Sequence, residues 1–328
     1  EDLWYPSAVD VGDVSGNVYV ADGYNYIRVY SADTNELINT IGTKPENDVD
    51  PGDFGSISAL CVDEATGKIY SVGYNSGLWE IDIDSKTGEQ LATPEELGLP
   101  SCEDIQEDTD GNLYISGSVF GGESGGSTGK IVKVTLEPLM QIQTVYEANY
   151  ELKRMEISPS GLIYFVDGNQ LVKRLNTNGT FDVVAYGSLL CNPSDVAFDQ
   201  NGDLLVANYY GDEIGSIVTK APDRTVGPTA VISEAGTIEV SDVQSGDIIK
   251  VYTLEEGEEG TAFTEGASVT ADGDTASIEN TFETGNIYIS YTRNGTESGL
   301  RELAVQAQSE DPGDDPGEEP EESGDELL

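Results

Sequence analysis

The sequence predicts an all-β protein in which one four-stranded unit is repeated along the first two thirds of the chain. Residues 6–42 (PSAVDVGDVSGNVYVADGYNYIRVYSADTNELINTIG) form four short apolar runs separated by clusters of Gly, Asn and Asp, which are signals of strands and turns. The same arrangement recurs downstream, with a turn glycine at positions 16, 67, 111, 161 and 202. A single four-stranded sheet cannot bury both of its faces, so the copies are expected to pack against one another.

The spacings between these glycines are 51, 44, 50 and 41 residues. This period is that of a four-stranded propeller blade, about 40–50 residues, and radial repetition of blades leaves only short, protected edges. The expected strands of five blades run, in chain order, over residues 7–11, 18–21, 27–30 and 37–41; 59–62, 69–72, 78–83 and 90–92; from near 103, then 113–116, 131–136 and 140–146; 152–157, 162–166, 171–175 and 181–185; and 193–198, 203–207 and 214–220.

The fifth blade lacks an evident fourth strand. Leu3, Trp4 and Tyr5 precede the first blade, and we expect them to supply that strand and close the ring, because closure pairs the open edges. A sixth blade missing from the chain end is the alternative.

A common pattern runs through the units: Pro, a short apolar strand, Asp, Gly-Asn, an apolar-Tyr-apolar strand and Asp before the next turn. Pro6, Gly16-Asn17, Tyr19 and Asp22 fit it well. The other copies are Pro193, Asp199, Gly202-Asp203 and Asn208; Gly161 with Tyr164 and Asp167; Gly111-Asn112 with Tyr114; and Gly67 with Tyr70. On these residues the chain resembles NHL-repeat β-propellers over about residues 1–220. Many such propellers have six blades, whereas five are counted here.

Residues 221–228 (APDRTVGP) break the pattern and are expected to form a linker. The segment 229–307 follows, with expected strands at 237–240, 247–253, 261–263, 267–269, 275–278, 286–293 and 300–306. Several short strands at close spacing suggest a β-sandwich. The runs TIEVSDVQSGDIIKVYT and GNIYISYTRNGTESGLRELAV resemble small Ig-like repeats of bacterial surface and S-layer-associated proteins.

Acidic residues outnumber basic ones by 62 to 15, which gives a net charge of −47. Residues 308–328 form an acidic tail rich in Pro and Gly, expected to be disordered or extended. The charge on the rest of the chain repels nucleic acid and anionic membrane, which excludes a nucleic-acid-binding role. The negative charge keeps the protein soluble, adapts it to a salty medium, or attracts Ca²⁺.

The chain contains no histidine, so the usual general base and the commonest zinc ligand are absent. The three cysteines, Cys61, Cys102 and Cys191, lack Cys-x-x-Cys spacing. Cys102 and Cys191 precede equivalent repeats, so a disulfide between them and three buried free thiols are both open. We predict that the protein is not an enzyme; a secreted lyase or hydrolase is the third alternative.

No apolar run approaches the ~20 residues needed to span a membrane, so membrane insertion is not expected. There is no signal peptide, and the chain begins at Glu1 without Met. This suits a mature secreted product or a trimmed chain. We therefore expect a secreted or cell-surface protein of a prokaryote.

The loops between the second and third strands of each blade share one propeller face with the blade-to-blade connections. They carry Tyr, Asn and Asp, which suit recognition of a protein or a glycan. The alternative is that the tyrosines pack between blades and that Asp22 and Asp167 brace turns. The predicted ligand-binding residues are Asp22, Tyr24, Asn25, Tyr26, Tyr74, Asn75, Tyr209 and Tyr210.

Two turns, 108–112 (DTDGN) and 199–203 (DQNGD), have a calcium-like composition. Because Ca²⁺ takes six to eight oxygen ligands, Asp108, Asp110, Asp199 and Asp203 are its predicted ligands. Both turns join the first and second blade strands, where Asp, Asn and Gly also serve hairpin geometry. No other cofactor is expected.

Asn178 and Asn294 begin Asn-Gly-Thr glycosylation sequons that equally suit hairpin turns.

The predicted function is that of a non-enzymatic extracellular or cell-surface protein whose propeller face binds a protein or a glycan. The alternative is a structural subunit of a repeating extracellular assembly, a filament or a surface layer. Its partners would then be copies of itself.

Overall fold

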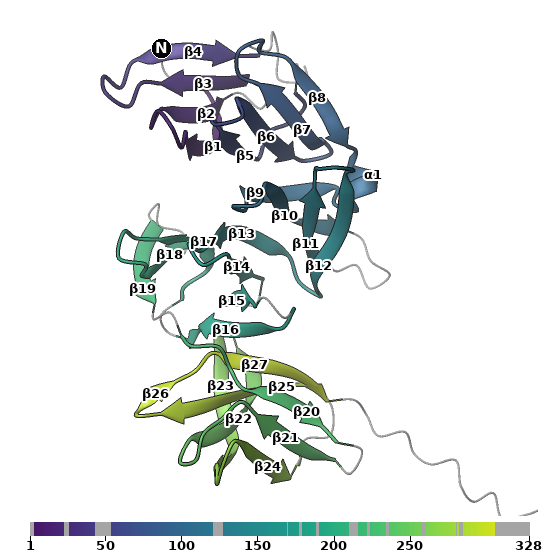
Figure 1. Ribbon diagram of the computed structural model, residues 1–328, viewed down its shortest axis with the longest axis vertical. Coiled ribbons are helices and arrows are strands. Elements are labelled where there is room, and N and C mark those ends of the chain that lie inside the picture. The colour runs from purple at the N-terminus through teal and green to yellow at the C-terminus, as the bar shows by residue number, and fades with distance from the viewer. Residues whose placement is uncertain are drawn as a thin grey trace, which may run out of the picture.

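Strands make up nearly all of the regular structure in the computed structural model (Figure 1). The structure describes residues 3–22, 26–42, 54–120, 127–168, 170–176, 179–187, 190–209, 216–221, 224–233, 236–257, 260–279, 281 and 285–305. The predicted all-β fold built on a propeller is confirmed. The acidic tail, Asn178 and three predicted ligand-binding residues (Tyr24, Asn25 and Tyr210) lie outside the described residues.

Five antiparallel sheets, called blades one to five here, follow one another along the chain. Blades one to four each have four strands in sequence order, and blade five has three among the residues that the structure describes. The strands are β1 (Pro6–Val11), β2 (Val18–Asp22), β3 (Tyr26–Tyr30) and β4 (Leu37–Ile41); β5 (Ala59–Asp63), β6 (Lys68–Gly73), β7 (Gly77–Asp82) and β8 (Gly88–Ala92); β9 (Ser101–Glu107), β10 (Asn112–Phe120), β11 (Ser127–Thr135) and β12 (Gln141–Ala148); β13 (Leu152–Ile157), β14 (Ile163–Asp167), β15 (Leu171–Leu175) and β16 (Phe181–Ala185); and β17 (Pro193–Phe198), β18 (Leu204–Tyr209) and β19 (Ser216–Ala221).

The first strand of each blade lies nearest the centre of the ring, and we call β1, β5, β9, β13 and β17 the inner strands (Figure 1). Each inner strand contacts the next one along the chain. Alternating apolar side chains fill the space between neighbouring blades. For example, Ala21 and Ile27 of blade one pack with Val62 and Ile69 of blade two. Repetition of such cores supports the ring, as expected for blades that cannot stand alone.

The predicted closure of the ring by Leu3–Tyr5 is wrong. These residues are not in a strand, and among the described residues they do not pair with blade five. The backbone N–H groups of Trp4 and Tyr5 both donate to Asp22 Oδ1 at 2.7 Å, so the segment is held against its own blade. Asp22 satisfies two backbone donors that strand pairing would otherwise have used.

One short helix, α1 (Pro94–Leu97), interrupts the strands between blades two and three. Thr93 caps it: its side chain accepts from Glu96 N, and the Glu96 side chain accepts from Thr93 N. Proline follows at the first helical position, where a missing N–H costs nothing. No helix in the described part of the chain is long and apolar enough to cross a membrane.

The C-terminal part is a two-layer β-sandwich. Buried Ile238, Val240, Ile249, Val251 and Ile289 meet between its sheets. One sheet contains β20 (Thr229–Ile232), β21 (Thr237–Ser241) and β24 (Thr275–Glu279); the other contains β22 (Ile248–Gly257), β23 (Gly260–Thr270), β25 (Gly285–Arg293), β26 (Thr296–Glu297) and β27 (Leu300–Val305). The expected strands at 261–263 and 267–269 are one strand, β23, that pairs with β22 across an irregularity at Val251/Tyr252.

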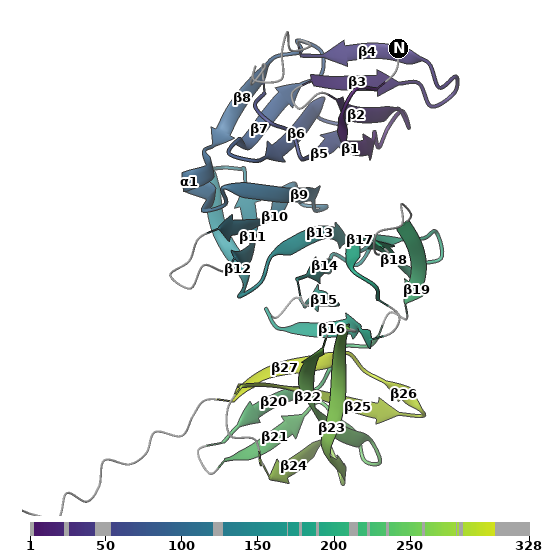
Figure 2. The same ribbon diagram turned by 180° about the vertical axis from the view of Figure 1, so that it is seen from behind.

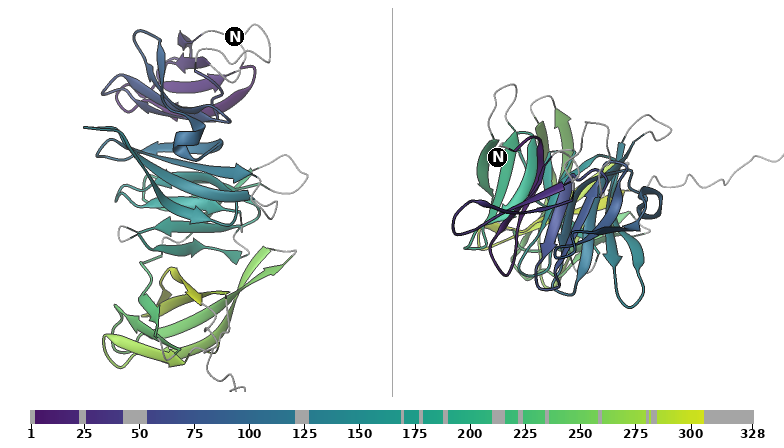
Figure 3. Two further views of the ribbon diagram at one scale, coloured as in Figure 1. Left: turned by 90° about the vertical axis from the view of Figure 1, so that its right-hand side faces the viewer. Right: turned by 90° about the horizontal axis from the view of Figure 1, so that it is seen from above.

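The sandwich is joined to blade four by strand pairing. Outer strand β16 pairs antiparallel with β27, so blade four and one sandwich sheet form a single nine-stranded sheet. Figure 2 shows β27 running beside β16 from behind, and Figure 3 (left) shows the sandwich beyond the propeller along the long axis. The Asp182↔Arg301 and Val183↔Leu300 pairs make this join.

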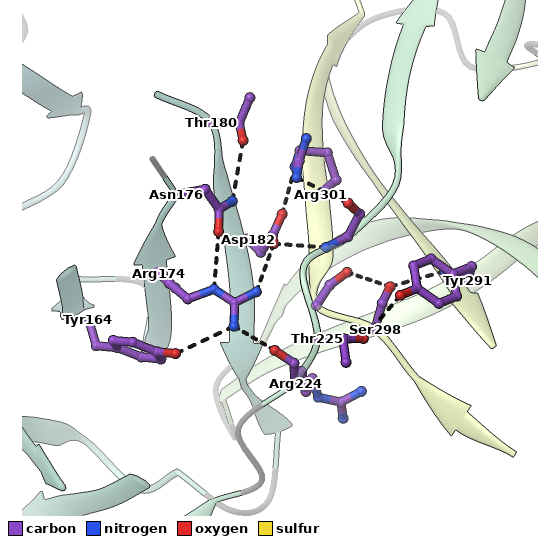
Figure 4. Close-up of polar contacts among 12 residues, drawn as sticks. Tyr164, Arg174, Asn176, Thr180, Asp182, Arg224, Thr225, Tyr291, Ser298 and Arg301 are labelled. Carbon is purple, nitrogen blue, oxygen red and sulfur yellow. Dashed lines mark hydrogen bonds and ion pairs between the residues drawn. The ribbon is translucent and has the colours of Figure 1, made fainter. Parts of the chain in front are cut away.

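A buried acid with two arginines lies at this join (Figure 4). Asp182 is fully buried, and its carboxylate receives Arg174 Nη2 at 3.0 Å and Arg301 Nε at 2.6 Å. Gly227 N donates to Asp182 Oδ2 at 2.9 Å. A methyl group on Gly299 would lie 2.8 Å from Asp182 Cβ, so glycine is needed for this close approach. The two guanidinium groups thus share one carboxylate, and they donate further to the carbonyl oxygens of Arg224 and Gly227.

Candidate functional site: the aromatic end and the axis of the propeller

The loops that join second to third strands, and one blade to the next, share one end of the propeller because the blades are antiparallel meanders. Among the described residues, every aromatic side chain that is strongly exposed lies at this end. We call it the aromatic end. Its exposed rings are Trp4, Tyr5, Tyr74, Phe120, Tyr150 and Tyr209. The opposite end exposes aliphatic side chains such as Val14 and Leu139 instead.

Asp22 and Tyr26, predicted as ligand-binding residues, lie under the surface. Asp22 is fully buried and Tyr26 is 2% exposed. Asp22 Oδ2 accepts from the Tyr26 hydroxyl at 2.9 Å and pairs with Arg28 Nε at 2.8 Å. With Trp4 N and Tyr5 N on Oδ1, this carboxylate braces the entry of the chain into blade one.

Tyr74 and Asn75 form an exposed tip between β6 and β7. The Tyr74 side chain is 58% exposed, and Asn75 adopts a positive φ of 49°. The tip is fixed from below, because Asn75 N donates to Pro100 O at 2.8 Å and Tyr74 pairs with Ser101. The backbone is therefore ordered while the ring faces solvent, which limits the entropy that a ligand must remove.

Tyr209 ends β18 on blade five and is half exposed. Its backbone N–H donates to Asn192 O at 2.9 Å, and the neighbouring Asn208 side chain accepts from Cys191 N at 3.0 Å. Asn208 thus does for blade five what Asp22 does for blade one. Between blades four and five, Lys153 Nζ donates to Asn192 Oδ1 at 3.0 Å, which adds a cation to this end.

The inner strands bring four carboxylates together along the axis of the ring, which the sequence reading missed. Asp10, Asp104, Glu156 and Asp195 lie on the inner strands of blades one, three, four and five, close enough for the other three to repel Glu156. Arg154 of β13 is the cation among them, and its Nη2 donates to Ser7 O at 3.4 Å across the ring. No local pattern marks these acids, because the inner strands β9 (SCEDIQE) and β13 (LKRMEI) carry several other polar residues.

Burial shifts the protonation of these acids. It raises the pKa of Asp104 to about 7, against the lowering effect of the Met155 N–H and of Arg154. It also raises the pKa of Glu156 to about 7, with repulsion from Asp104, Asp195 and Asp10 adding to the shift. Glu107, at the edge of the axis, has its pKa raised to about 7 by burial and by Asp63. Acidic groups with pKa values raised to near neutrality are candidates for proton transfer.

The predicted calcium ligands are occupied by turn contacts. Asp108 Oδ1 accepts from Asp110 N, Asn112 N and Asn112 Nδ2, all within 3.0 Å. Asp199 Oδ1 likewise accepts from Asn201 N and Asp203 N. In the described part of the chain, no three His, Cys, Asp or Glu side chains gather to hold a metal. These geometries are those of Asx turns.

We expect Asp108→Ala to lower the stability by about 1 kcal/mol through the lost turn hydrogen bonds, equally in CaCl₂ and in chelator. Thermal unfolding of wild type and variant in both buffers checks this. If calcium raises the melting temperature of the wild type but not of the variant, Asp108 is a calcium ligand after all.

The three thiols are free. Cys102 is buried, and burial raises its pKa to about 12, so it is a poor nucleophile at neutral pH. Cys191 is exposed, so the alternatives of a Cys102–Cys191 disulfide and of three buried thiols both differ from the structure. Asn294 and Gly295, with φ of 52° and 81°, form the two-residue turn between β25 and β26.

No protein-family model and no curated protein sequence matches this chain. Solved structures do match. A gluconolactonase from Xanthomonas campestris is 12% identical with a TM-score of 0.50, over 73% of this chain and 83% of its own. A luciferin-regenerating enzyme is 12% identical with a TM-score of 0.50, over 73% and 84%. The extracellular domain of a hybrid two-component system from B. thetaiotaomicron is 12% identical with a TM-score of 0.46, over 90% of this chain and 44% of its own, so this chain spans less than half of it.

These comparisons correct one prediction. We predicted that the protein is not an enzyme, yet two of the propellers that share its fold are a gluconolactonase and a luciferin-regenerating enzyme. The fold therefore does not exclude catalysis. At 12% identity the likeness shows the fold alone, and that fold is a β-propeller.

Proposed function

We propose that this chain is a recognition module of the bacterial cell surface that binds a protein or a glycan at the aromatic end of its propeller. The supporting observation is the segregation of exposed aromatic rings, from Trp4 on blade one to Tyr209 on blade five, at one end. Tyrosine and tryptophan carry much of the binding energy at interfaces because they add large rigid contact area. The resemblance to NHL-repeat propellers and to Ig-like repeats of bacterial surface proteins supports the location.

The double variant Tyr74→Ala/Tyr209→Ala is expected to weaken ligand binding at least tenfold, since each exposed anchor contributes on the order of 1–2 kcal/mol. Both side chains are about half exposed, so the fold should not change. The measurement is binding to a glycan array and to an array of purified extracellular proteins, followed by titration calorimetry on any hit.

The matched control is Leu139→Ala/Met140→Ala, which removes exposed apolar side chains from the opposite end. Equal loss of binding in both double variants would contradict an aromatic-end site. A hit on only one of the two arrays decides between glycan and protein.

A second candidate is a structural subunit of a repeating extracellular assembly. The pairing of β16 with β27 favours it, because a rigid two-domain unit presents its contact surfaces at fixed relative positions. Sedimentation across a range of protein concentrations tests it: concentration-dependent polymers support the assembly, and a monomer throughout contradicts it.

A further inference from the structure

The ring of blades is open on one side. Each inner strand packs on the next from β1 to β17, but β17 and β1 do not pack together in the described part of the chain. Figure 1 draws no strand between blade five and blade one, and we call the space between them the open sector. Its two flanks are the face of blade one that looks away from blade two, and the face of blade five that looks away from blade four.

The pairing register of the strands shows which residues of the first flank have no blade packed against them. Val9 pairs with Val20, which lies four residues after the turn glycine of blade one, Gly16. The equivalent residue in each later blade packs against the preceding blade and is buried. These residues are Leu60 (6% exposed), Ile105 (1%), Met155 (1%) and Val196 (3%), whereas Val9 is 64% exposed. Val11, on the same face, is 54% exposed. Blade one therefore presents a blade-packing face with no preceding blade.

The second flank shows the complementary defect. Ala207 of blade five is only partly buried. The residues at its register position in the other blades, which face the following blade, are fully buried. They are Ala21, Val72, Ser116 and Val166, all at 0%. On both flanks, the side chains that a blade in the open sector would contact are thus more exposed than their equivalents in the other blades.

A hydrogen-bonding pattern points the same way. Asp104 accepts from its own neighbour Ile105 N and, with Oδ2, from Met155 N on the next blade, both at 2.9 Å. Asp195 holds the same register position on blade five and accepts from its own neighbour Val196 N at 2.8 Å. Among the described residues, no following blade supplies the second donor to Asp195. Its carboxylate is placed to receive a backbone N–H from an inner strand in the open sector.

The excess of acidic side chains near the axis predicts which charge an inner strand docked in the open sector would carry. Asp10, Asp104 and Asp195 all repel Glu156, whereas the Arg154 guanidinium attracts Asp104 and Asp195. Buried carboxylates in such excess raise one another's pKa and favour a nearby cation. An inner strand carrying Lys or Arg, as β13 does, would complete the pairing.

We infer that the open sector is the docking site for one β-sheet blade of a separate polypeptide, apolar on both faces and basic on its inner strand. A second copy of this chain is a poor occupant, because each copy carries a net charge of −47 and its blades already pack against one another. The inference uses the flanks of the ring and not the aromatic end, so it goes beyond the proposed function.

The test supplies a blade of known sequence. An extra copy of residues 149–190, which contains β13–β16 and its two inner-strand cations, is placed ahead of residue 3 through a linker with a protease site. Cys191→Ser removes the exposed native thiol, and Val9→Cys then places a thiol on the first flank. We expect the added blade to slow thiol labelling at position 9 at least tenfold. Leu139→Cys, at the opposite end, is the matched control and should not change.

After the linker is cut, the added blade should co-elute with the full chain on gel filtration. The added blade should be released by Val9→Asp or by Asp195→Ala in the full chain. Replacing both Lys153 and Arg154 by glutamate in the added copy should also release it. Unchanged labelling at position 9, or release from the wild-type chain, would overturn the docking site. If the native chain instead forms dimers that Val9→Asp dissociates, the occupant is a second copy and the separate partner is overturned.

Discussion

Replacing Asp182 by alanine is expected to lower the free energy of unfolding by about 3–5 kcal/mol, the range found when one partner of a buried ion pair is removed. Asp182 is fully buried and pairs with both Arg174 and Arg301, which are 2% and 5% exposed. Without it, two guanidinium groups stay buried beside an unpaired Gly227 N–H. Asp182→Asn, which keeps the shape but removes the charge, should also destabilise.

The matched control is Glu80→Ala, which breaks the Lys68–Glu80 pair at 3.0 Å, where both side chains are nearly a third exposed. Exposed pairs contribute about 0–1 kcal/mol, so this variant should change little. Guanidinium denaturation followed by tryptophan fluorescence reports the propeller, because Trp4 and Trp79 both lie there, and circular dichroism reports the whole chain. A cost for Asp182→Ala no larger than for Glu80→Ala would show that the join does not depend on this charge.

The second expected result is a loss of stability as the pH rises from about 5 to about 8. The pKa of Asp104 is raised by burial from 3.8 to about 7. Between these values the folded chain binds a proton that the unfolded chain has released, so stability falls with increasing pH and levels off above the folded pKa. For Asp104 alone the difference amounts to about 4 kcal/mol at most. Glu156, with its pKa raised to about 7, acts in the same direction.

Thermal unfolding at several pH values measures this, and Asp104→Asn should flatten the profile. Asp84→Asn, on the hairpin between β7 and β8, is the control and should keep the wild-type profile. The profile should turn over below about pH 5, because Glu64 and Glu297 have lowered pKa values through their hydrogen bonds and lose that stabilisation once protonated. Rising stability between pH 5 and 8 would contradict a buried protonated axis.

The repeats, the turn glycines and the order of the strands follow from local sequence, because each blade is a meander of short strands with its own turn chemistry. Helix α1 was also readable: Thr93 and Glu96 form a capping box around Pro94. The buried position of Tyr26 could be weighed only as an alternative, since Tyr serves both packing and recognition.

What the sequence did not predict depends on contacts distant along the chain. Arg301 reaches Asp182 across 119 residues, and no local pattern marks that pairing. Whether the ring closes depends on how the side chains of each blade pack on the next blade, and no local pattern predicts that. The axis acids do not stand out in the sequence, because β9 and β13 carry other polar residues, and only the radial arrangement of the blades brings Asp10 and Asp195 near Glu156.

The pairing of β16 with β27 has a consequence for solubility. A free sheet edge is a template for strand addition and aggregation, and this one contact covers an edge of blade four and an edge of the sandwich together. The outer edge strand β12 of blade three has no such cover from the sandwich. It carries Gln141, Gln143 and Glu147 on largely exposed positions, which discourage addition by charge and polarity. These two edges are thus protected in different ways, by backbone pairing at β16 and by polar side chains at β12.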